Sequence, residues 1–167
     1  MLHNIFDAHS HYDDKWFDAD RSALLSSLPQ HGVATIVNAA VDIETAQTAI
    51  GYAEAYPHMY ACAGIHPENL DGLAEDYLDQ LTELLKHPKV VALGEIGLDY
   101  HWDIPKDRQH RVFEEQLQLA RELDVPVVIH DREAHGDVME YIRRYHPKGL
   151  MHCFSGSAEL AREYVKM

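Results

Sequence analysis

Short apolar runs alternate with amphipathic stretches along the whole chain, and this alternation predicts an α/β protein. Six runs of mostly apolar residues, several of them β-branched, are typical of buried strands. They span residues 4–8, 34–40, 59–65, 90–96, 126–130 and 149–154. Between these runs, apolar residues recur every three or four positions, as in Leu78, Leu81 and Leu85, which is the spacing of a helix with one buried face. The repeated order of strand and helix predicts a parallel sheet covered by helices.

Cap and turn residues agree with this division. Asp42 is placed to cap a helix over residues 43–56, and Gly32 is placed to end the helix before it. A proline closes each of four helical stretches, at positions 57, 88, 126 and 147. No linker or low-complexity tract interrupts the sequence, so residues 1–167 are expected to form a single domain built of βα units.

Composition and charge exclude several classes of protein. The chain has 167 residues, of which 46% are hydrophobic, so it can bury a core of ordinary size. A formal net charge of -14 argues against a broad basic face that wraps DNA. Cys62 and Cys153 lie in apolar runs and are expected in the core, and the first residues lack the pattern of a signal peptide, which together predict a cytoplasmic protein. No apolar run approaches the roughly 18 residues of a membrane span, so no membrane contact is expected.

Polar residues gather where the predicted strands end. Five of the 13 histidines and one glutamate fall at these places: His9, His11, His66, Glu95, His130 and His152. In (β/α) folds the carboxyl ends of the strands meet at one edge of the sheet, and active sites are assembled there. We therefore expect these side chains to lie close together at a functional site.

The first two histidines have the spacing of metal ligands. Side chains two apart on a strand point to the same face, so His9 and His11 can offer two nitrogens to one cation. Taken alone, such a pair is more typical of a hydrated turn entry than of a metal site. Convergence with Glu95, His130 and His152 from other strands favours metal binding by all five residues.

Glu95 is expected to be the central ligand. It is flanked by Leu93 and Ile96, and a carboxylate buried there needs a counter-charge or hydrogen bonds. Its strand contains no arginine or lysine, and the lysines avoid the predicted strand ends, which argues against a Schiff base and against a carbamylated lysine as bridge. Glu95 can instead bridge two divalent ions, which can be magnesium, manganese or zinc. Such a pair can bind a phosphate oxygen, activate a water and stabilise the leaving oxygen.

Three further residues are candidates for substrate binding. Arg132 and His135 in "HDREAHGD" lie where a guanidinium can hold a phosphate bidentately. The alternative for Arg132 is a surface ion pair with Glu133 or near Asp137. His66 in "GIHPEN" either touches substrate, which we favour, or orients its loop.

Five segments resemble, in order and spacing, the signatures of the TatD family of metal-dependent deoxyribonucleases: "DAHSHYDD", "GIHPEN", "GEIGLDYHWD", "PVVIHDREAHGD" and "MHCFSGS". The resemblance implies a TIM-type (β/α) barrel with two divalent ions. It implies that His9 and His11 hold one ion, that His130 and His152 hold the other, and that Glu95 bridges them as the catalytic carboxylate. It also implies hydrolysis of phosphodiester bonds in DNA, as an exonuclease acting on single strands or strand ends.

The sequence departs from that family in one respect. A complete barrel has eight βα units and about 250 residues, whereas six units are visible here. The last two units are missing, and with them an aspartate that the family carries in a late Thr-Asp segment. We therefore expect an incomplete barrel. Two alternative functions stay open: a metal-dependent hydrolase of a small ester, amide or phosphoester, and a non-catalytic remnant that binds metal.

Overall fold

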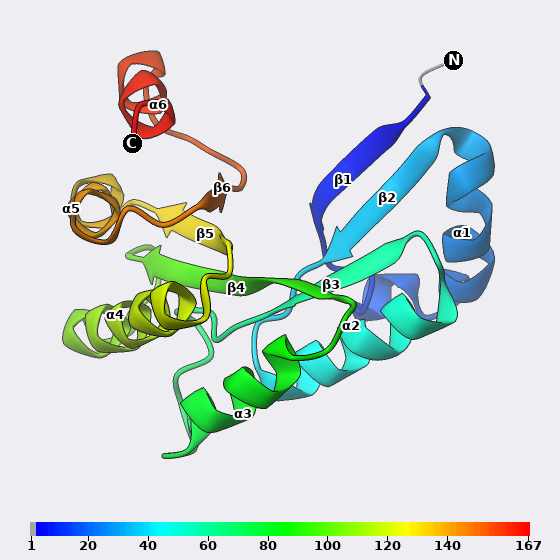
Figure 1. Ribbon diagram of the computed structural model, residues 1–167, viewed down its shortest axis with the longest axis horizontal. Coiled ribbons are helices and arrows are strands. Elements are labelled where there is room, and N and C mark those ends of the chain that lie inside the picture. Colours follow the sequence, from blue (N-terminus) through cyan, green and yellow to red (C-terminus); the bar gives the residue numbers. More distant parts are fainter. Residues whose placement is uncertain (1–2) are drawn as a thin grey trace.

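The structure of the chain, a computed structural model, describes residues 3–167 and contains one sheet of six parallel strands. The strands lie side by side in the order in which they occur along the chain: β1 (Ile5–Ser10), β2 (Val33–Asn38), β3 (Met59–Ala63), β4 (Val90–Asp99), β5 (Val127–Arg132) and β6 (Gly149–Met151). The sheet curls, so that β1 and β6 stand at its two ends (Figure 1). The expected α/β architecture, six of the eight βα units of a TIM-type barrel, is confirmed as a half-barrel.

Each strand is followed by a helix. These helices are α1 (Arg21–Ser27), α2 (Ile43–Ala55), α3 (Tyr77–Leu85), α4 (Lys106–Leu123), α5 (His135–Tyr145) and α6 (Ala158–Val165), with two 3₁₀ turns, η1 (Lys15–Phe17) and η2 (Leu28–His31). Helices α2, α3 and α4 lie along the outer side of the curled sheet (Figure 1). Within residues 3–167, every helix is too short or too polar to cross a bilayer.

The two predicted caps are confirmed. The Asp42 side chain accepts a hydrogen bond from the Thr45 backbone N–H at 2.8 Å, and the Thr45 hydroxyl accepts one from the Asp42 N–H at 3.0 Å. This reciprocal capping box satisfies N–H groups that the first turn of α2 leaves free. Gly32 ends η2 with a φ of 91°, a left-handed conformation that favours glycine.

The alternation of side chains along the strands separates an outer core from an inner one. Residues such as Leu93, Ile96 and Ile129 pack with helix residues in the larger cluster. A smaller inner cluster is made mainly of strand residues, with Val37, Ala39, Cys62, Ala92 and Val128 buried in it. Since side chains two apart on a strand share a face, His130 and Arg132 follow Val128 onto the inner face of β5.

Several strand boundaries differ from the predicted ones. β4 continues to Asp99 and β5 to Arg132, so Glu95 and His130 lie inside strands and not at their ends. β6 is only three residues long, so His152 follows it directly. Cys62 is buried as expected, but the prediction for Cys153 is wrong, because the chain leaves β6 before this residue and its side chain is exposed.

Candidate metal centre

An irregularity in β4 turns Glu95 toward the inside of the curled sheet. Leu93 pairs with Val127 of β5 and Ile96 pairs with Ile129, so three steps along β4 match two steps along β5. Such a bulge re-aims side chains, and bulges are frequent beside active sites. Leu93 and Ile96 both face the helices, while Glu95 between them points to the inner face, where it is only 2% exposed.

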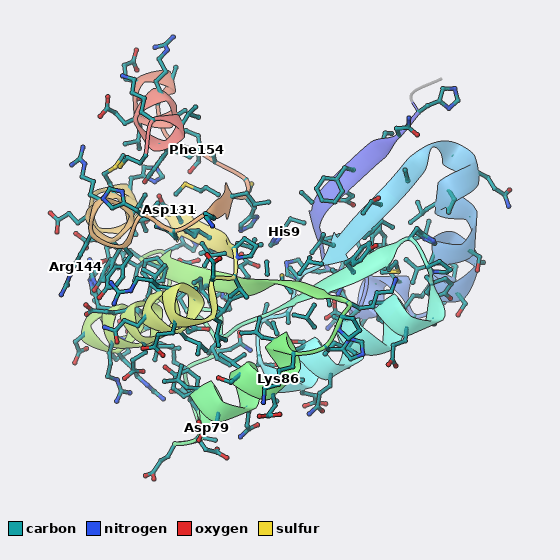
Figure 2. The ribbon with its side chains drawn as sticks, viewed as in Figure 1. His9, Asp79, Lys86, Asp131, Arg144 and Phe154 are labelled. Atoms are coloured by element: carbon teal, nitrogen blue, oxygen red, sulfur yellow. The ribbon has the colours of Figure 1, made fainter. Side chains whose placement is uncertain are left out.

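Two histidine side chains meet at one oxygen of this carboxylate. Glu95 Oε2 lies 3.2 Å from His9 Nε2 and 3.3 Å from His11 Nε2. The two imidazole nitrogens are 3.1 Å apart. Figure 2 shows His9 at the end of β1, pointing into the space that the curled sheet encloses. The predicted H-x-H pair therefore converges on Glu95 from the far end of the sheet.

The other carboxylate oxygen faces a second set of histidines. Glu95 Oε1 lies 2.9 Å from His130 Nδ1 and 2.5 Å from His152 Nε2. His130 Nδ1 and His152 Nε2 are 3.3 Å apart. The ring of His152 also stacks on that of His9, with centroids 3.8 Å apart, so the two sets adjoin. One buried carboxylate thus offers a separate oxygen to each pair of histidines.

These atoms fit divalent ions. Ligands held about 2.0 to 2.2 Å from a metal in a tetrahedral or octahedral shell stand about 3 to 3.5 Å from one another. The separations around Glu95 Oε2 are 3.1 to 3.3 Å. Imidazole nitrogens and carboxylate oxygens suit zinc, manganese and related ions. The donor set and its spacing therefore match metal ligation, while metal binding by these five residues stays a prediction.

Charge in the cluster is strongly coupled. Burial alone would raise the pKa of Glu95, but hydrogen bonds from His11, His130, His152 and His66 outweigh it and hold that pKa far below its usual range. The hydrogen bond to Glu95 raises the pKa of His11. Burial lowers the pKa of His9. Burial opposes charge on His130 as well, but Glu95 and Asp99 prevail and raise its pKa. Glu95 is therefore an anion that requires cations around it.

His66 also reaches the cluster, in a role that its hydrogen bonds define. Its Nε2 lies 3.5 Å from Glu95 Oε1, and its ring is buried. Its Nδ1 accepts a hydrogen bond from the Glu68 backbone N–H at 3.2 Å. A neutral imidazole that accepts at Nδ1 carries its proton on Nε2. His66 therefore presents an N–H donor to the site and not a free lone pair, which favours a contact with substrate over metal ligation.

The two other candidate substrate residues lie outside the histidine cluster. Arg132, at the end of β5, places its guanidinium 5.9 Å from the centroid of the Trp102 ring. Its proposed surface partner Glu133 pairs instead with His101 at 3.1 Å, and no carboxylate in residues 3–167 lies within 4.0 Å of the Arg132 side chain. His135, the first residue of α5, is held by Asp131, with Nδ1 2.7 Å from Oδ2.

Sequence reasoning missed Asp99. It is fully buried, and its Oδ2 lies 2.8 Å from His130 Nε2. Its place in "GEIGLDY", four residues after Glu95 on what proves to be the same strand, is the signal that was available. The predicted strand ended at residue 96, which left Asp99 in a loop.

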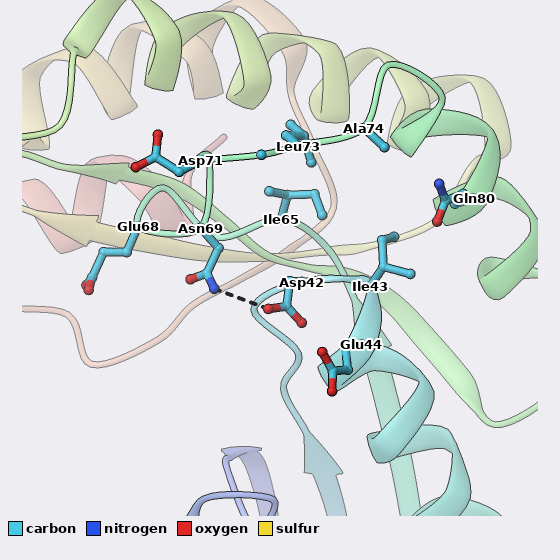
Figure 3. A pocket seen from close by; sticks show the side chains of 11 residues that line it. Asp42, Ile43, Glu44, Ile65, Glu68, Asn69, Asp71, Leu73, Ala74 and Gln80 are labelled. Carbon is cyan, nitrogen blue, oxygen red and sulfur yellow. Dashed lines mark hydrogen bonds between the residues drawn. The ribbon is translucent and has the colours of Figure 1, made fainter.

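One cavity lies apart from the histidine cluster. It has a volume of about 470 Å³ and is formed by the loop after β3 and the start of α2 (Figure 3). Asn69 Nδ2 donates to Asp42 Oδ2 across it at 3.2 Å. Four carboxylates line the cavity: Asp42, Glu44, Glu68 and Asp71. Since these acids repel phosphate, the cavity does not compete with the histidine cluster for a phosphate-containing substrate.

Comparisons with known proteins agree with the geometry. A family model described as TatD related DNase matches residues 6–167. The uncharacterized metal-dependent hydrolase YabD of Bacillus subtilis (strain 168) is 41% identical over 167 residues, covering 98% of this chain and 66% of that protein. A protein of Musicola paradisiaca (strain Ech703) named 3'-5' ssDNA/RNA exonuclease TatD is 33% identical, covering 93% of this chain and 61% of that protein.

Solved structures show the same relationship. The crystal structure of YJJV, a TatD homologue from Escherichia coli K12, matches with a TM-score of 0.91 and 36% identity, covering 99% of this chain and 66% of that one. The chain spans about two thirds of the length of the curated relatives it matches. A family model that matches nearly every residue and relatives above 30% identity lead to one conclusion: the chain belongs to the TatD family of metal-dependent hydrolases.

Proposed function

We propose that the protein hydrolyses phosphodiester bonds of DNA, at single strands or strand ends, with two divalent ions. In this proposal His9 and His11 hold one ion, His130 and His152 hold the other, and Glu95 bridges both. One observation carries it: the two oxygens of a single buried carboxylate each face their own pair of imidazoles, at 2.5 to 3.3 Å. The printed name of the Musicola relative, an ssDNA/RNA exonuclease, supports the choice of substrate.

The proposed chemistry divides between ions and side chains. When bound, two divalent ions supply positive charge that neutralises a phosphate and acidifies a water. Glu95 keeps its negative charge and stays between the two histidine pairs. His66 directs its Nε2–H into the site, where it can donate to a phosphate oxygen. Arg132 follows His130 on the inner face of β5, so its guanidinium can hold a phosphate of the same strand bidentately.

The acidic character of the protein limits how it can bind DNA. With a formal charge of -14, the surface offers little attraction to a long polyanion. A strand end needs only a few phosphate contacts, which the ions and Arg132 can supply. Binding should therefore be weak, and its dependence on salt should reflect those few contacts.

DNA should be the preferred substrate over small esters, and chelation should abolish the activity. We expect this for an extended version, in which residues 1–167 continue through two further βα units taken from a relative. The test compares hydrolysis of a single-stranded oligonucleotide, a small phosphodiester, a carboxylic ester and an amide with manganese, with magnesium and with EDTA. Turnover of the carboxylic ester or amide alone would favour the alternative function, a metal-dependent hydrolase of a small ester or amide. Undiminished DNA hydrolysis in excess EDTA would contradict the metal dependence.

Removing Arg132 should weaken substrate binding more than turnover. Arg132→Ala in the extended version deletes a charge-assisted phosphate contact, for which a loss of about 1.5 to 3 kcal/mol is typical. KM for DNA should therefore rise by about 10- to 100-fold, with a smaller change in kcat. Arg143→Ala is the matched control, since Arg143 is exposed on α5 and its ion pair with Glu163 is long, at 4.0 Å. An unchanged KM for Arg132→Ala would remove this residue from the substrate site.

A further inference from the structure

Asp99 is a buried carboxylate whose two oxygens are both engaged. Oδ1 accepts a hydrogen bond from the His101 backbone N–H at 2.9 Å, and Oδ2 lies 2.8 Å from His130 Nε2. The residue is on the same strand as Glu95 and is fully buried. Burying a carboxylate away from solvent costs free energy unless it is paired. The contact with His130 therefore supplies the pairing that Asp99 needs.

Gln109 of α4 fixes the backbone at Asp99. Its Oε1 accepts from the Asp99 N–H at 2.8 Å, and its Nε2 donates to the Asp99 carbonyl at 2.8 Å and to the Ile104 carbonyl at 3.2 Å. Gln109 is itself only 1% exposed. The three hydrogen bonds of this buried amide therefore hold the end of β4 and the loop after it.

Asp99 decides which nitrogen of His130 faces the site. An ionised carboxylate only accepts hydrogen bonds, so His130 Nε2 must carry a proton toward it. When Nδ1, the atom 2.9 Å from Glu95 Oε1 and 3.3 Å from His152 Nε2, gives its lone pair to an ion instead of donating to Glu95, the one remaining ring proton is on Nε2, facing Asp99. We propose that Asp99, held by Gln109, is a positioning residue that fixes His130 in the tautomer whose Nδ1 is free to bind the second ion.

The metal part of this inference rests on the proposed function, while the proton on His130 Nε2 follows from the contact with Asp99 alone. His152 faces Glu95 through its Nε2, whereas His130 faces Glu95 through its Nδ1. The two histidines of this pair therefore present different ring nitrogens. A partner that fixes the ring is therefore needed at His130. Carboxylate partners of this kind orient metal-ligating histidines, and their loss lowers metal affinity by about 10- to 100-fold.

The Asp99→Asn variant tests this role without changing shape. The amide oxygen must face the His101 N–H, which leaves the amide –NH₂ against His130 Nε2. His130 then accepts at Nε2 and carries its proton on Nδ1, pointing at the position that the ion needs. In a titration with manganese or zinc, one of two binding steps should weaken by about 10- to 100-fold, and the other should not change.

A second buried aspartate provides the matched control. Asp131 also accepts from a backbone N–H, that of Ala134 at 3.3 Å, and from a histidine, His135 at 2.7 Å, but His135, unlike His130, has no contact with Glu95. Asp131→Asn should leave both metal-binding steps unchanged. Thermal melts of both variants check that folding is retained.

Nitrogen-15 NMR of the histidines gives a readout that does not depend on metal. Without metal, His130 should carry a proton on Nε2 in the wild type, whether or not Nδ1 also donates to Glu95, and on Nδ1 alone in Asp99→Asn. Both experiments are run on the 167-residue chain and on the extended version, so neither depends on the stability of the shorter one. A wild-type His130 without a proton on Nε2, or two unchanged binding steps in Asp99→Asn, would overturn the inference. A wild type that binds no ion would instead count against the proposed function, and the tautomer would still decide the role of Asp99.

Discussion

Glu95→Gln is expected to abolish metal binding and hydrolysis together, although it hardly changes the shape of the side chain. In the wild type, each carboxylate oxygen faces its own histidine pair. Oε2 lies 3.2 and 3.3 Å from the nitrogens of one pair, and Oε1 lies 2.9 and 2.5 Å from those of the other. An amide has only one oxygen, so one pair must face an –NH₂ group, and the bridging negative charge is lost. Breaking a buried ionic interaction costs about 3 to 5 kcal/mol, which corresponds to a loss of about 10²- to 10⁴-fold in metal affinity.

The measurement is the number of metal ions bound after equilibrium dialysis, together with DNA hydrolysis by the extended version. His66→Ala removes a hydrogen-bond donor but no predicted ligand, so it should retain both ions and lose activity alone. Glu115→Gln is a control for the substitution itself, because Glu115 accepts from Tyr77 far from the histidines. Retention of two ions by Glu95→Gln would show that this carboxylate does not bridge them.

The parts of the site that follow from strand alternation were accessible from the sequence. His9 and His11 are two apart at the end of an apolar run, and this spacing alone places both on one face. The repeat of strand and helix brings His130 and His152 to the same side of the sheet. These inferences need only the alternation of side chains and the common edge at which parallel strands end, and they hold although His11 and His152 lie one residue beyond β1 and β6.

The parts that could not be predicted depend on irregular pairing between strands. Glu95 was predicted as the central ligand, but the bulge in β4 that turns it to the inner face is defined by the register of β4 against β5 and is not visible in β4 alone. The run "LGEIGLD" contains two glycines, so its apolar pattern weakens and the strand looked shorter than it is. Asp99 and its contact with His130 lay beyond that predicted end. Likewise, the tautomer of His66 depends on the Glu68 N–H, a loop contact that no residue pattern reveals.

The open ends of the half-barrel have an expected consequence for activity. β1 and β6 stand at the two ends of the sheet, and unpaired strand edges favour association with other chains. β6 has three residues, and α6 has no buried residue, with Val165 89% exposed. Leu160 and Tyr164 of α6 are only partly buried. An amphipathic helix without a fully buried residue contributes little to stability, since helices are stabilised mainly by packing of their apolar face.

The extended version should therefore be both more stable and far more active than residues 1–167 alone. Two further βα units would pair with β1 and β6 and cover α6. They would also bring the late aspartate that the family resemblance implies as a ligand and as the group that orients the water, for which residues 1–167 contain no counterpart. Loss of a general base alone typically slows a reaction by about 10²- to 10⁴-fold, so we expect at least that difference in DNA hydrolysis with manganese. The two versions are compared at equal concentration, with thermal melts and light scattering beside the assay. Equal rates and a cooperative melt of a monomeric short chain would show that six βα units suffice and that no further carboxylate is needed.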